Sequence, residues 1–395
     1  MTADRMTDLM PKKSKPASLA TTLRAEAPLL AGAATTAIFF TLGKTWTEDF
    51  SQPVLTVVLF AWLFAVMVWC AFGVVRHAEV LAEHLGEPYG TLILTVSVIS
   101  IEVAIMATVM LHGGPNPTLP RDTVFAVLMI VLNGMVGASV VIGALRYHEQ
   151  QYNLQGAVAF LAVISCLAVI SLVLPSFTVS TPDHSMTMLQ AVVFGTLTAL
   201  LYGGFLVIQT MRHSAFFMET KSAPAARRGA KVVEHAESHA GHGPTYSIPV
   251  HTLLLLLTLL PVVLLSKPLA NVIDYGIEQL KAPTALGGIL IAILVLSPEG
   301  LSSLQAARRN QLQRSVNLSL GSALSTIGLT IPTMIVISLM TGAPLELGLS
   351  SVDTILLLLT LFIAQMTFSG APTNILLGGV HLVLFAAFIV LIFNP

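Results

Sequence analysis

The hydrophobic positions of the chain form long unbroken runs that are separated by short polar segments. Most runs have about 20 residues, the length that a helix needs to cross the hydrocarbon core of a bilayer. The runs predicted to span a membrane are 27–41, 53–75, 90–111, 122–145, 154–174, 188–210, 250–266, 285–305, 315–340, 352–367 and 374–393. Barrel strands would be shorter and would alternate in polarity, which these runs do not. The pattern therefore predicts an all-α polytopic membrane protein with eleven transmembrane helices.

Composition supports this fold class and excludes several functions. The chain is 55% hydrophobic and only 10% charged, whereas soluble domains carry about 25% charged residues. A net charge of −1 argues against a nucleic-acid partner, which would require a basic face. The sequence contains no Gly-x-x-x-x-Gly-Lys-Ser/Thr loop for ATP. We also find no set of nucleophile, base and orienting residue, so we expect neither an enzyme nor an ATP-driven pump.

Lys and Arg residues predict the orientation. With the N-terminus in the cytoplasm, fifteen of the 19 Lys and Arg residues fall on the cytoplasmic side and four fall outside. Positive charges are enriched in the cytoplasmic loops of membrane proteins. This distribution also supports the helix count, because removing one early span would reverse the side of every later loop.

The polar segments divide the chain into five parts. We predict a solvated cytoplasmic tail (1–26), an extra transmembrane helix with its loop (27–52), a first five-helix unit (53–210), a cytoplasmic acidic and His-bearing linker (211–248) and a second five-helix unit (249–395). In the linker, His235, His239 and His242 would share one face of a helix. These imidazoles suit a regulatory metal or pH site, and a plain solvated linker is the alternative reading.

The two five-helix units resemble each other around a pair of glutamates. Gly, Val, Ser and Glu recur 197 positions apart, from Gly90 to Glu102 in one unit and from Gly287 to Glu299 in the other. In the helix that follows, Arg121 precedes a run ending in Asn133-Gly134, and Arg314 precedes one ending in Ser325-Thr326. Five is an odd number, so the two repeats enter the membrane from opposite sides. Inverted repeats of this kind place their binding site near the midplane, where the repeats meet.

Glu102 and Glu299 are the acidic residues that fall deep inside apolar spans. A carboxylate at this depth is costly, so it indicates an ion or proton site. The alternative is a protonated Glu that only bonds to a neighbouring helix. If the two carboxylates meet, desolvation and mutual repulsion favour protonation of at least one, whereas a bound cation favours the charged form of both. Binding of cation and proton would then be mutually exclusive, as an exchanger requires.

Oxygen-bearing side chains near the two glutamates are candidate supporting ligands, because hard cations prefer oxygen. These candidates are Ser100, Asn133, Ser297, Ser322, Ser325 and Thr326. Many hydroxyls in membrane helices instead bond to their own backbone. Pro298, directly before Glu299, predicts a helix break that would free backbone carbonyls as further ligands.

Longer strings carry a family resemblance. Residues 97–104 (SVISIEVA), the run from Arg121 to Gly134, and the segments 297–301 (SPEGL), 309–314 (RNQLQR) and 321–328 (GSALSTIG) resemble the calcium/cation antiporter superfamily in its cation/proton exchanger branch. Within it, they are most similar to the bacterial Cha-type sodium/potassium/calcium–proton antiporters. The resemblance implies alternating access in a bacterial inner membrane, with inorganic cations and protons as partners, no cofactor, and Glu102 and Glu299 as the exchanging residues.

One departure from the family pattern bears on the ion. The exchanger motif has Gly-Asn shortly before each Glu, where this chain has Val98-Ile99 and Val295-Leu296. Each repeat therefore lacks an amide ligand. We expect export of Ca²⁺, Na⁺ or K⁺ in exchange for protons, with a Na⁺ or K⁺ exchanger without Ca²⁺ activity as the alternative. A passive cation channel and an intramembrane metal-dependent enzyme are more distant alternatives. The pattern specifies no oligomeric state.

Overall fold

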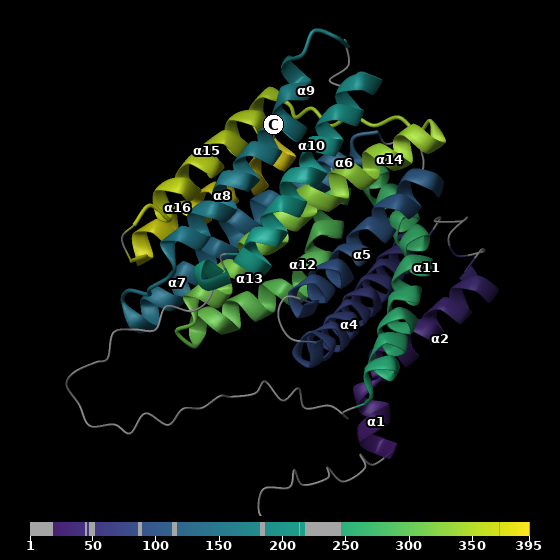
Figure 1. Cartoon of the computed structure of the whole chain (residues 1–395). Coiled ribbons are helices and arrows are strands. Elements are labelled where there is room, and N and C mark those ends of the chain that lie inside the picture. The colour runs from purple at the N-terminus through teal and green to yellow at the C-terminus, as the bar shows by residue number, and fades with distance from the viewer. Residues whose placement is uncertain are drawn as a thin grey trace, which may run out of the picture.

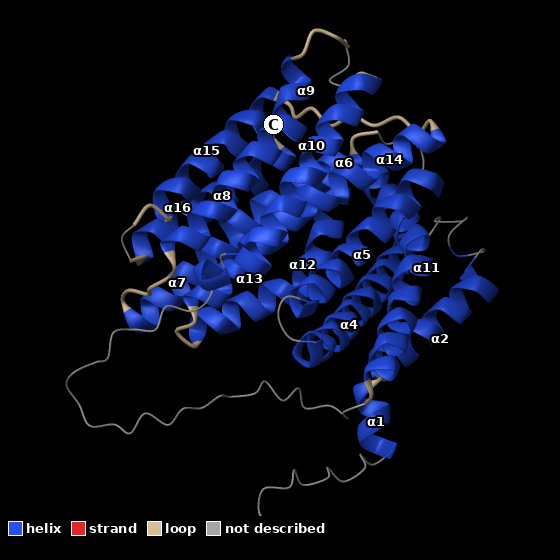
Figure 2. Cartoon of the chain, viewed as in Figure 1, coloured by secondary structure: helices blue, strands red, loops and turns tan. Residues whose placement is uncertain are grey.

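A computed structural model describes residues 19–43, 46, 52–85, 89–112, 117–181, 186–212, 214–217, 246–370 and 372–394. Helices make up nearly all of this part of the chain, and no β-strand is present in it (Figure 2). The linker histidines His235, His239 and His242 lie outside the described residues, as does most of the predicted linker.

All eleven predicted spans are helical in the structure (Figure 1). Unbroken α-helices form seven of them: α2 (Ala27–Thr41), α4 (Pro53–Leu85), α5 (Tyr89–His112), α11 (Ile248–Leu280), α12 (Ala285–Arg308), α15 (Ser351–Thr367) and α16 (Ile375–Phe393). Eight helices are long and apolar enough to cross a membrane, and three shorter apolar ones complete the eleven among the described residues. The helices α4 and α11 run well past their predicted ends, and a short helix α1 (Leu19–Ala25) lies in the segment predicted to be a solvated tail.

The other four spans contain a π-helical segment, which the sequence did not predict. The third helix of the first repeat consists of α6 (Leu119–Met129), η2 (Ile130–Met135) and α7 (Val136–Tyr147). Its counterpart in the second repeat consists of α13 (Leu312–Ser325), η6 (Thr326–Thr330) and α14 (Ile331–Thr341). The remaining two spans are α8–η3–α9 (Leu154–Ala168, Val169–Val173, Leu174–Phe177) and α10–η4 (Met188–Val207, Ile208–Arg212). Such π segments are frequent at functional sites, and η2 and η6 occupy matching places in the two repeats.

Contacts between the repeats come in exchanged pairs, as an inverted repeat requires. The helix α12 packs on α6, η2 and α7, while α5 packs on α13, η6 and α14. Likewise α16 packs on α7, while α10 packs on α14. Each contact of a second-repeat helix with a first-repeat helix thus has a partner with the repeats exchanged. This arrangement confirms the fold predicted from the two glutamate-centred segments.

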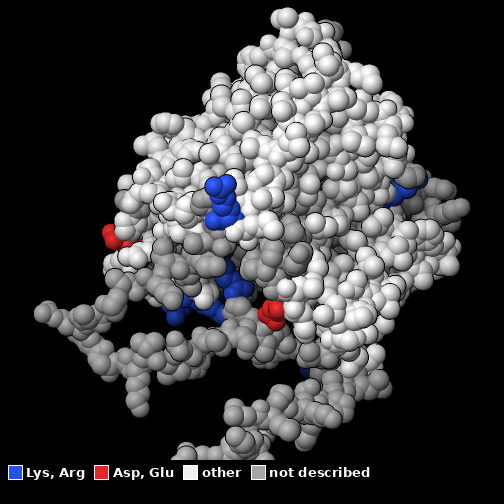
Figure 3. All heavy atoms as spheres, viewed as in Figure 1, with Lys and Arg blue, Asp and Glu red and all other residues white. Residues whose placement is uncertain are grey.

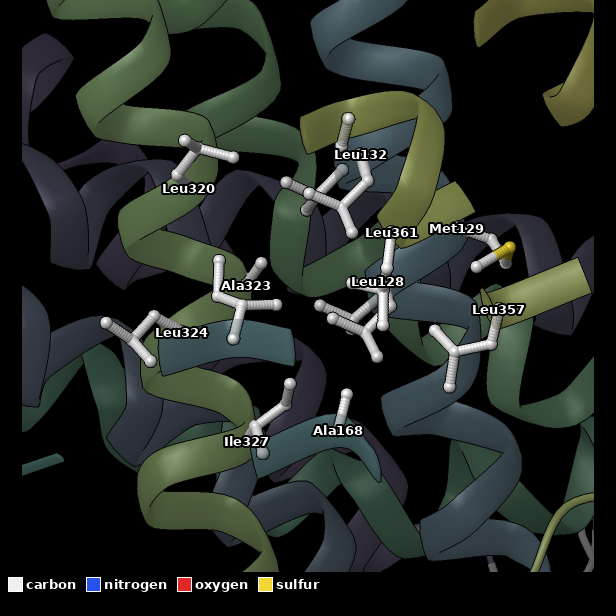
Figure 4. Packing of buried hydrophobic residues seen from close by; sticks show 14 of the residues in the cluster. Leu128, Met129, Leu132, Ala168, Leu320, Ala323, Leu324, Ile327, Leu357 and Leu361 are labelled. Atoms are coloured by element: carbon white, nitrogen blue, oxygen red, sulfur yellow. The ribbon is translucent and has the colours of Figure 1, made fainter. Parts of the chain in front are cut away.

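Two hydrophobic cores lie on either side of α12. One core joins α6–α7, α8, α13–α14, α15 and α16, and Figure 4 shows Leu128, Leu132, Leu320 and Ala323 packed across it. The other joins α2, α4, α5 and α11. Residues of α12 belong to both cores: Ile289 lies in the first and Ile291 in the second. The helix that carries Glu299 is therefore fixed on two sides.

The extra helix α2 is attached at its start by a buried polar cluster. Glu26 accepts a hydrogen bond from Arg76 at 2.8 Å and lies 3.2 Å from Nε2 of His77. Nδ1 of His77 lies 3.0 Å from Nδ1 of His251 on α11. This cluster joins α2 to the first helix of each repeat, since α4 and α11 are those helices.

Charged side chains are sparse on the face seen in Figure 3, where a broad uncharged surface covers most of the described atoms. Large exposed apolar residues lie along the outer helices, among them Phe40, Val54, Leu200 and Phe362. A soluble monomer rarely exposes so much contiguous apolar surface. The surface is that of a protein embedded in lipid.

Candidate functional site

Glu102 lies in the interior of α5, ten residues before the end of that helix at His112. Glu102 is buried, with 2% of its surface exposed. Oε2 accepts a hydrogen bond of 2.8 Å from the Thr326 hydroxyl, whereas Oε1 has no hydrogen-bond partner among the described residues. A buried carboxylate oxygen without a partner is costly, which makes this oxygen a candidate for binding a ligand or a proton.

Glu299 occupies the corresponding place on α12 and is 8% exposed. Its Oε2 is also buried and has no partner within the described part of the chain. Glu299 interacts electrostatically with Glu102 and with Glu79. The two glutamates predicted from the repeat are therefore brought into one neighbourhood, one from each repeat.

Among the predicted supporting residues, Thr326 is hydrogen-bonded to one of the two glutamates, Glu102. It begins η6 in the second repeat and bonds to Glu102 in the first, so the contact crosses between the repeats over 224 positions. In a π-helical segment the backbone bonds run from residue i to i+5, so its side chains point in other directions than they would in a regular α-helix. The candidate site therefore combines a carboxylate from one repeat with a hydroxyl from the other.

The predicted serine ligands are engaged elsewhere. The hydroxyls of Ser100, Ser297 and Ser325 donate to the backbone carbonyls of Val96, Ile293 and Ser322, at 2.6, 2.5 and 3.0 Å respectively. For Ser322, the bond in the structure is the one that its backbone carbonyl accepts from Ser325. These bonds are the local ones that hydroxyls in helices commonly make, and they do not bring the serine side chains to either glutamate.

Asn133 is fully buried in η2, but its amide is also engaged away from the glutamates. Its Nδ2 donates to the Thr360 hydroxyl at 2.9 Å, and its Oδ1 lies 3.2 Å from Nδ1 of His381. Since Oδ1 can only accept, this contact is a hydrogen bond in the tautomer whose proton is on Nδ1 of His381. This network ties η2 to α15 and α16, which is the helix-joining role that polar groups often have in membrane bundles.

Pro298 does not interrupt its helix. The helix α12 continues through this residue from Ala285 to Arg308. The break predicted before Glu299 is therefore not an end of the helix, because packing on both cores holds α12 in place around the missing N–H group.

Glu79 is a carboxylate that the sequence reading missed. It lies in α4 beyond the predicted end of that span at residue 75, and it interacts electrostatically with Arg314 as well as with Glu299. Ala78 and Leu81 are buried in the same turn, but Arg76 and His77 interrupt the apolar run, so hydrophobic length gave no signal for this part of the helix. Glu79 is exposed, so it lies at the surface of the protein.

Buried carboxylates and hydroxyls that converge between inverted repeats define a class, the polytopic ion transporters. Residues 55–211 and 250–394 match the sodium/calcium exchanger protein family, and the chain belongs to this family of transporters. The Sinorhizobium fredii protein y4hA is 41% identical over 340 residues, covering 86% of this chain and 89% of that protein. The sodium-potassium/proton antiporter ChaA of Escherichia coli is 36% identical over 348 residues, covering 88% and 92%.

Solved structures share the fold. The structure of native YfkE superposes with a TM-score of 0.70 at 17% identity, covering 93% of this chain and 100% of that one. The H⁺/Ca²⁺ exchanger CAX gives a TM-score of 0.62 at 13% identity, covering 93% and 88%. At these identities the likeness concerns the fold, and it agrees with the all-helical architecture predicted from the sequence.

Proposed function

We propose that this protein is a cation/proton antiporter that exports Ca²⁺, Na⁺ or K⁺ in exchange for protons across a bacterial inner membrane. The observation that carries the proposal is the pairing of Glu102 and Glu299. Both are buried, they come from opposite repeats and lie near enough to interact electrostatically, and each has an oxygen that lacks a partner in the described structure. ChaA, whose name describes it as a sodium-potassium/proton antiporter, supports the same activity.

The exchange follows from charge balance at the pair. Two neighbouring carboxylates in a dry site repel each other, and a proton on at least one relieves this repulsion. A bound cation relieves it as well, and then both carboxylates bind as anions. Since proton and cation compensate the same charge, each displaces the other, and alternating access carries them in opposite directions.

The identity of the cation depends on the ligands around the pair. The residues before each glutamate are apolar, and Ile99, Val295 and Leu296 are buried. Ca²⁺ takes six to eight oxygen ligands, so the loss of an amide ligand in each repeat favours monovalent cations. We therefore keep a Na⁺ or K⁺ exchanger without Ca²⁺ activity as the second candidate.

Proton flux in everted membrane vesicles tests both candidates. With a pH gradient imposed, we expect Na⁺, K⁺ or Ca²⁺, added separately, to dissipate the gradient, as reported by a pH-sensitive dye. Dissipation by Na⁺ or K⁺ alone would select the second candidate. If none of the three cations dissipates the gradient in vesicles that contain the protein, the proposal is wrong.

A passive channel is distinguished in the same vesicles. An exchanger drives the cation against its own gradient when a pH gradient is imposed, whereas a channel cannot. Uphill accumulation of the labelled cation therefore supports antiport, and strictly downhill flux would contradict it.

Membrane orientation is a separate prediction. The distribution of Lys and Arg places the N-terminus in the cytoplasm, and an odd number of spans places the C-terminus outside. Reporter fusions at Met1 and Asn394 should be active in opposite compartments. A C-terminal reporter that is active in the cytoplasm would contradict the eleven-span topology.

A further inference from the structure

Thr330 is a second hydroxyl that faces Glu102 from η6. It is four residues after Thr326, so both side chains lie on one side of the segment. The residue is 0% exposed. Its hydroxyl is near enough to interact with the Glu102 carboxylate, yet its Oγ1 forms no hydrogen bond of normal geometry with any described atom.

Two unpartnered oxygens therefore belong to the same small region, Oγ1 of Thr330 and Oε1 of Glu102. Buried polar atoms are nearly always hydrogen-bonded, and an exception needs an explanation such as an ion or a ligand. The second carboxylate oxygen of Glu102 already accepts a bond from Thr326. The atoms left for a ligand are thus oxygens, which are the atoms that hard cations prefer.

We infer that Thr330 is a direct ligand of the exchanged cation, so that Glu102, Thr326 and Thr330 coordinate it mainly from one side of the site. This inference rests on the proposed antiport function. When Glu102 is protonated, Oε1–H can donate to Oγ1 of Thr330. When a cation replaces that proton, both oxygens turn their lone pairs to the cation, and the Thr330 hydroxyl proton points away from it.

The other repeat offers no matching hydroxyl to Glu299. Arg121 and Arg314 set the repeat offset at 193, so the counterparts of Thr326 and Thr330 are residues 326 − 193 = 133 and 330 − 193 = 137, namely Asn133 and Gly137. Asn133 is bonded to Thr360 and lies against His381.

Gly137 is closely packed against α16. A Cβ atom at this position would lie 2.9 Å from Cβ of His381 and 3.1 Å from the carbonyl oxygen of Gly378. The first repeat thus uses these two positions to pack helices, whereas the second uses them to place hydroxyls beside a carboxylate. Neutral ligands for the cation therefore come from η6, and Glu299 contributes its carboxylate.

The test compares Thr330→Val with Thr330→Ser. Valine keeps the shape and removes the hydroxyl, and serine keeps the hydroxyl. In everted vesicles, Thr330→Val should raise the half-saturating concentration of the transported cation by about five- to a hundredfold, measured with Na⁺, K⁺ and Ca²⁺ separately. Thr330→Ser should retain most of the wild-type affinity.

Thermal stability separates a ligand from a packing residue. Without cation, Thr330→Val removes the acceptor of the bond that protonated Glu102 donates, so the purified variant should melt slightly below wild type. When the cation is added, the variant should gain much less stability than wild type. A lower melting temperature with unchanged half-saturation would assign Thr330 to packing and overturn the inference.

Thr354→Val is the matched control. Thr354 is also buried and its Oγ1 is also without a partner in the described chain, but it lies on α15 rather than beside Glu102. This variant should leave the half-saturating concentration unchanged. If wild type exchanges cations and Thr330→Val has the same half-saturation, the role of Thr330 is wrong. If wild type exchanges none of the three cations, the proposed function fails, and this inference with it.

Discussion

Replacing either buried glutamate by glutamine should abolish cation-dependent proton flux, reducing it to the level of vesicles that lack the protein. Gln has nearly the shape of Glu, and at position 102 it can still accept the hydrogen bond from Thr326. It carries neither a charge that compensates the cation nor an exchangeable proton. Glu102→Gln and Glu299→Gln should therefore fold and insert normally while losing exchange completely, because each carboxylate takes part in the same charge balance.

The measurement is dye-reported proton flux in everted vesicles, with protein content determined by immunoblot. Glu278→Gln is a suitable control, since Glu278 is exposed near the end of α11 and its loss should leave the flux unchanged. Glu102→Asp and Glu299→Asp should keep part of the activity, because they retain the carboxylate. Near-normal flux in either Gln variant would remove that residue from the coupling site.

Gly288→Ala should destabilise the protein by about 1–3 kcal/mol, the usual cost of forcing extra atoms into a close-packed interior. A Cβ atom at Gly288 would lie 2.7 Å from the backbone nitrogen of Thr123 and 2.8 Å from the backbone carbon of Asp122. Backbone atoms cannot rotate aside as a flexible side chain can. The helix α12 would have to move away from α6, and this contact joins the two repeats.

Gly276→Ala provides the matched control. Gly276 is in the helix α11, and nothing lies within 4 Å of a Cβ atom placed there. Alanine favours a helix over glycine by up to about 1 kcal/mol, so this variant should be as stable as wild type or more stable. Melting temperatures of both variants in one detergent test the prediction. Equal stability of the two variants would show that the α6–α12 contact is looser than the structure indicates.

Sequence patterns predicted the helices because, in a bilayer, each segment must satisfy its own backbone hydrogen bonds. A chain in lipid must satisfy its own backbone groups, so a run of about 20 apolar residues such as residues 285–305 specifies a helix without reference to its neighbours. The same rule explains why α4 was predicted too short. Beyond residue 75 the helix carries Arg76, His77 and Glu79, and it continues because it packs on α11 and not because it is apolar.

The glutamates could be found from the sequence because an acidic residue in an apolar run stands out and because the repeat marks the same position twice. Their surroundings could not be found in this way. Asn133 and Thr326 occupy the same place in the two repeats, yet Thr326 bonds to Glu102 and Asn133 bonds to Thr360. Which neighbour a polar side chain meets depends on the rotation and crossing of helices that are distant in sequence.

The sequence alone thus determined an all-helical membrane protein, its eleven spans, its two repeats and its pair of deep carboxylates. Those features follow from hydrophobic length and from charge, which are properties of each segment by itself. The tertiary structure decided that α12 passes unbroken through Pro298, that Thr326 of η6 bonds to Glu102, and that the buried Thr330 hydroxyl lies near the same carboxylate. Contacts between residues more than 200 positions apart arise only when the two repeats pack together, because close packing, and not local preference, sets which side chains meet.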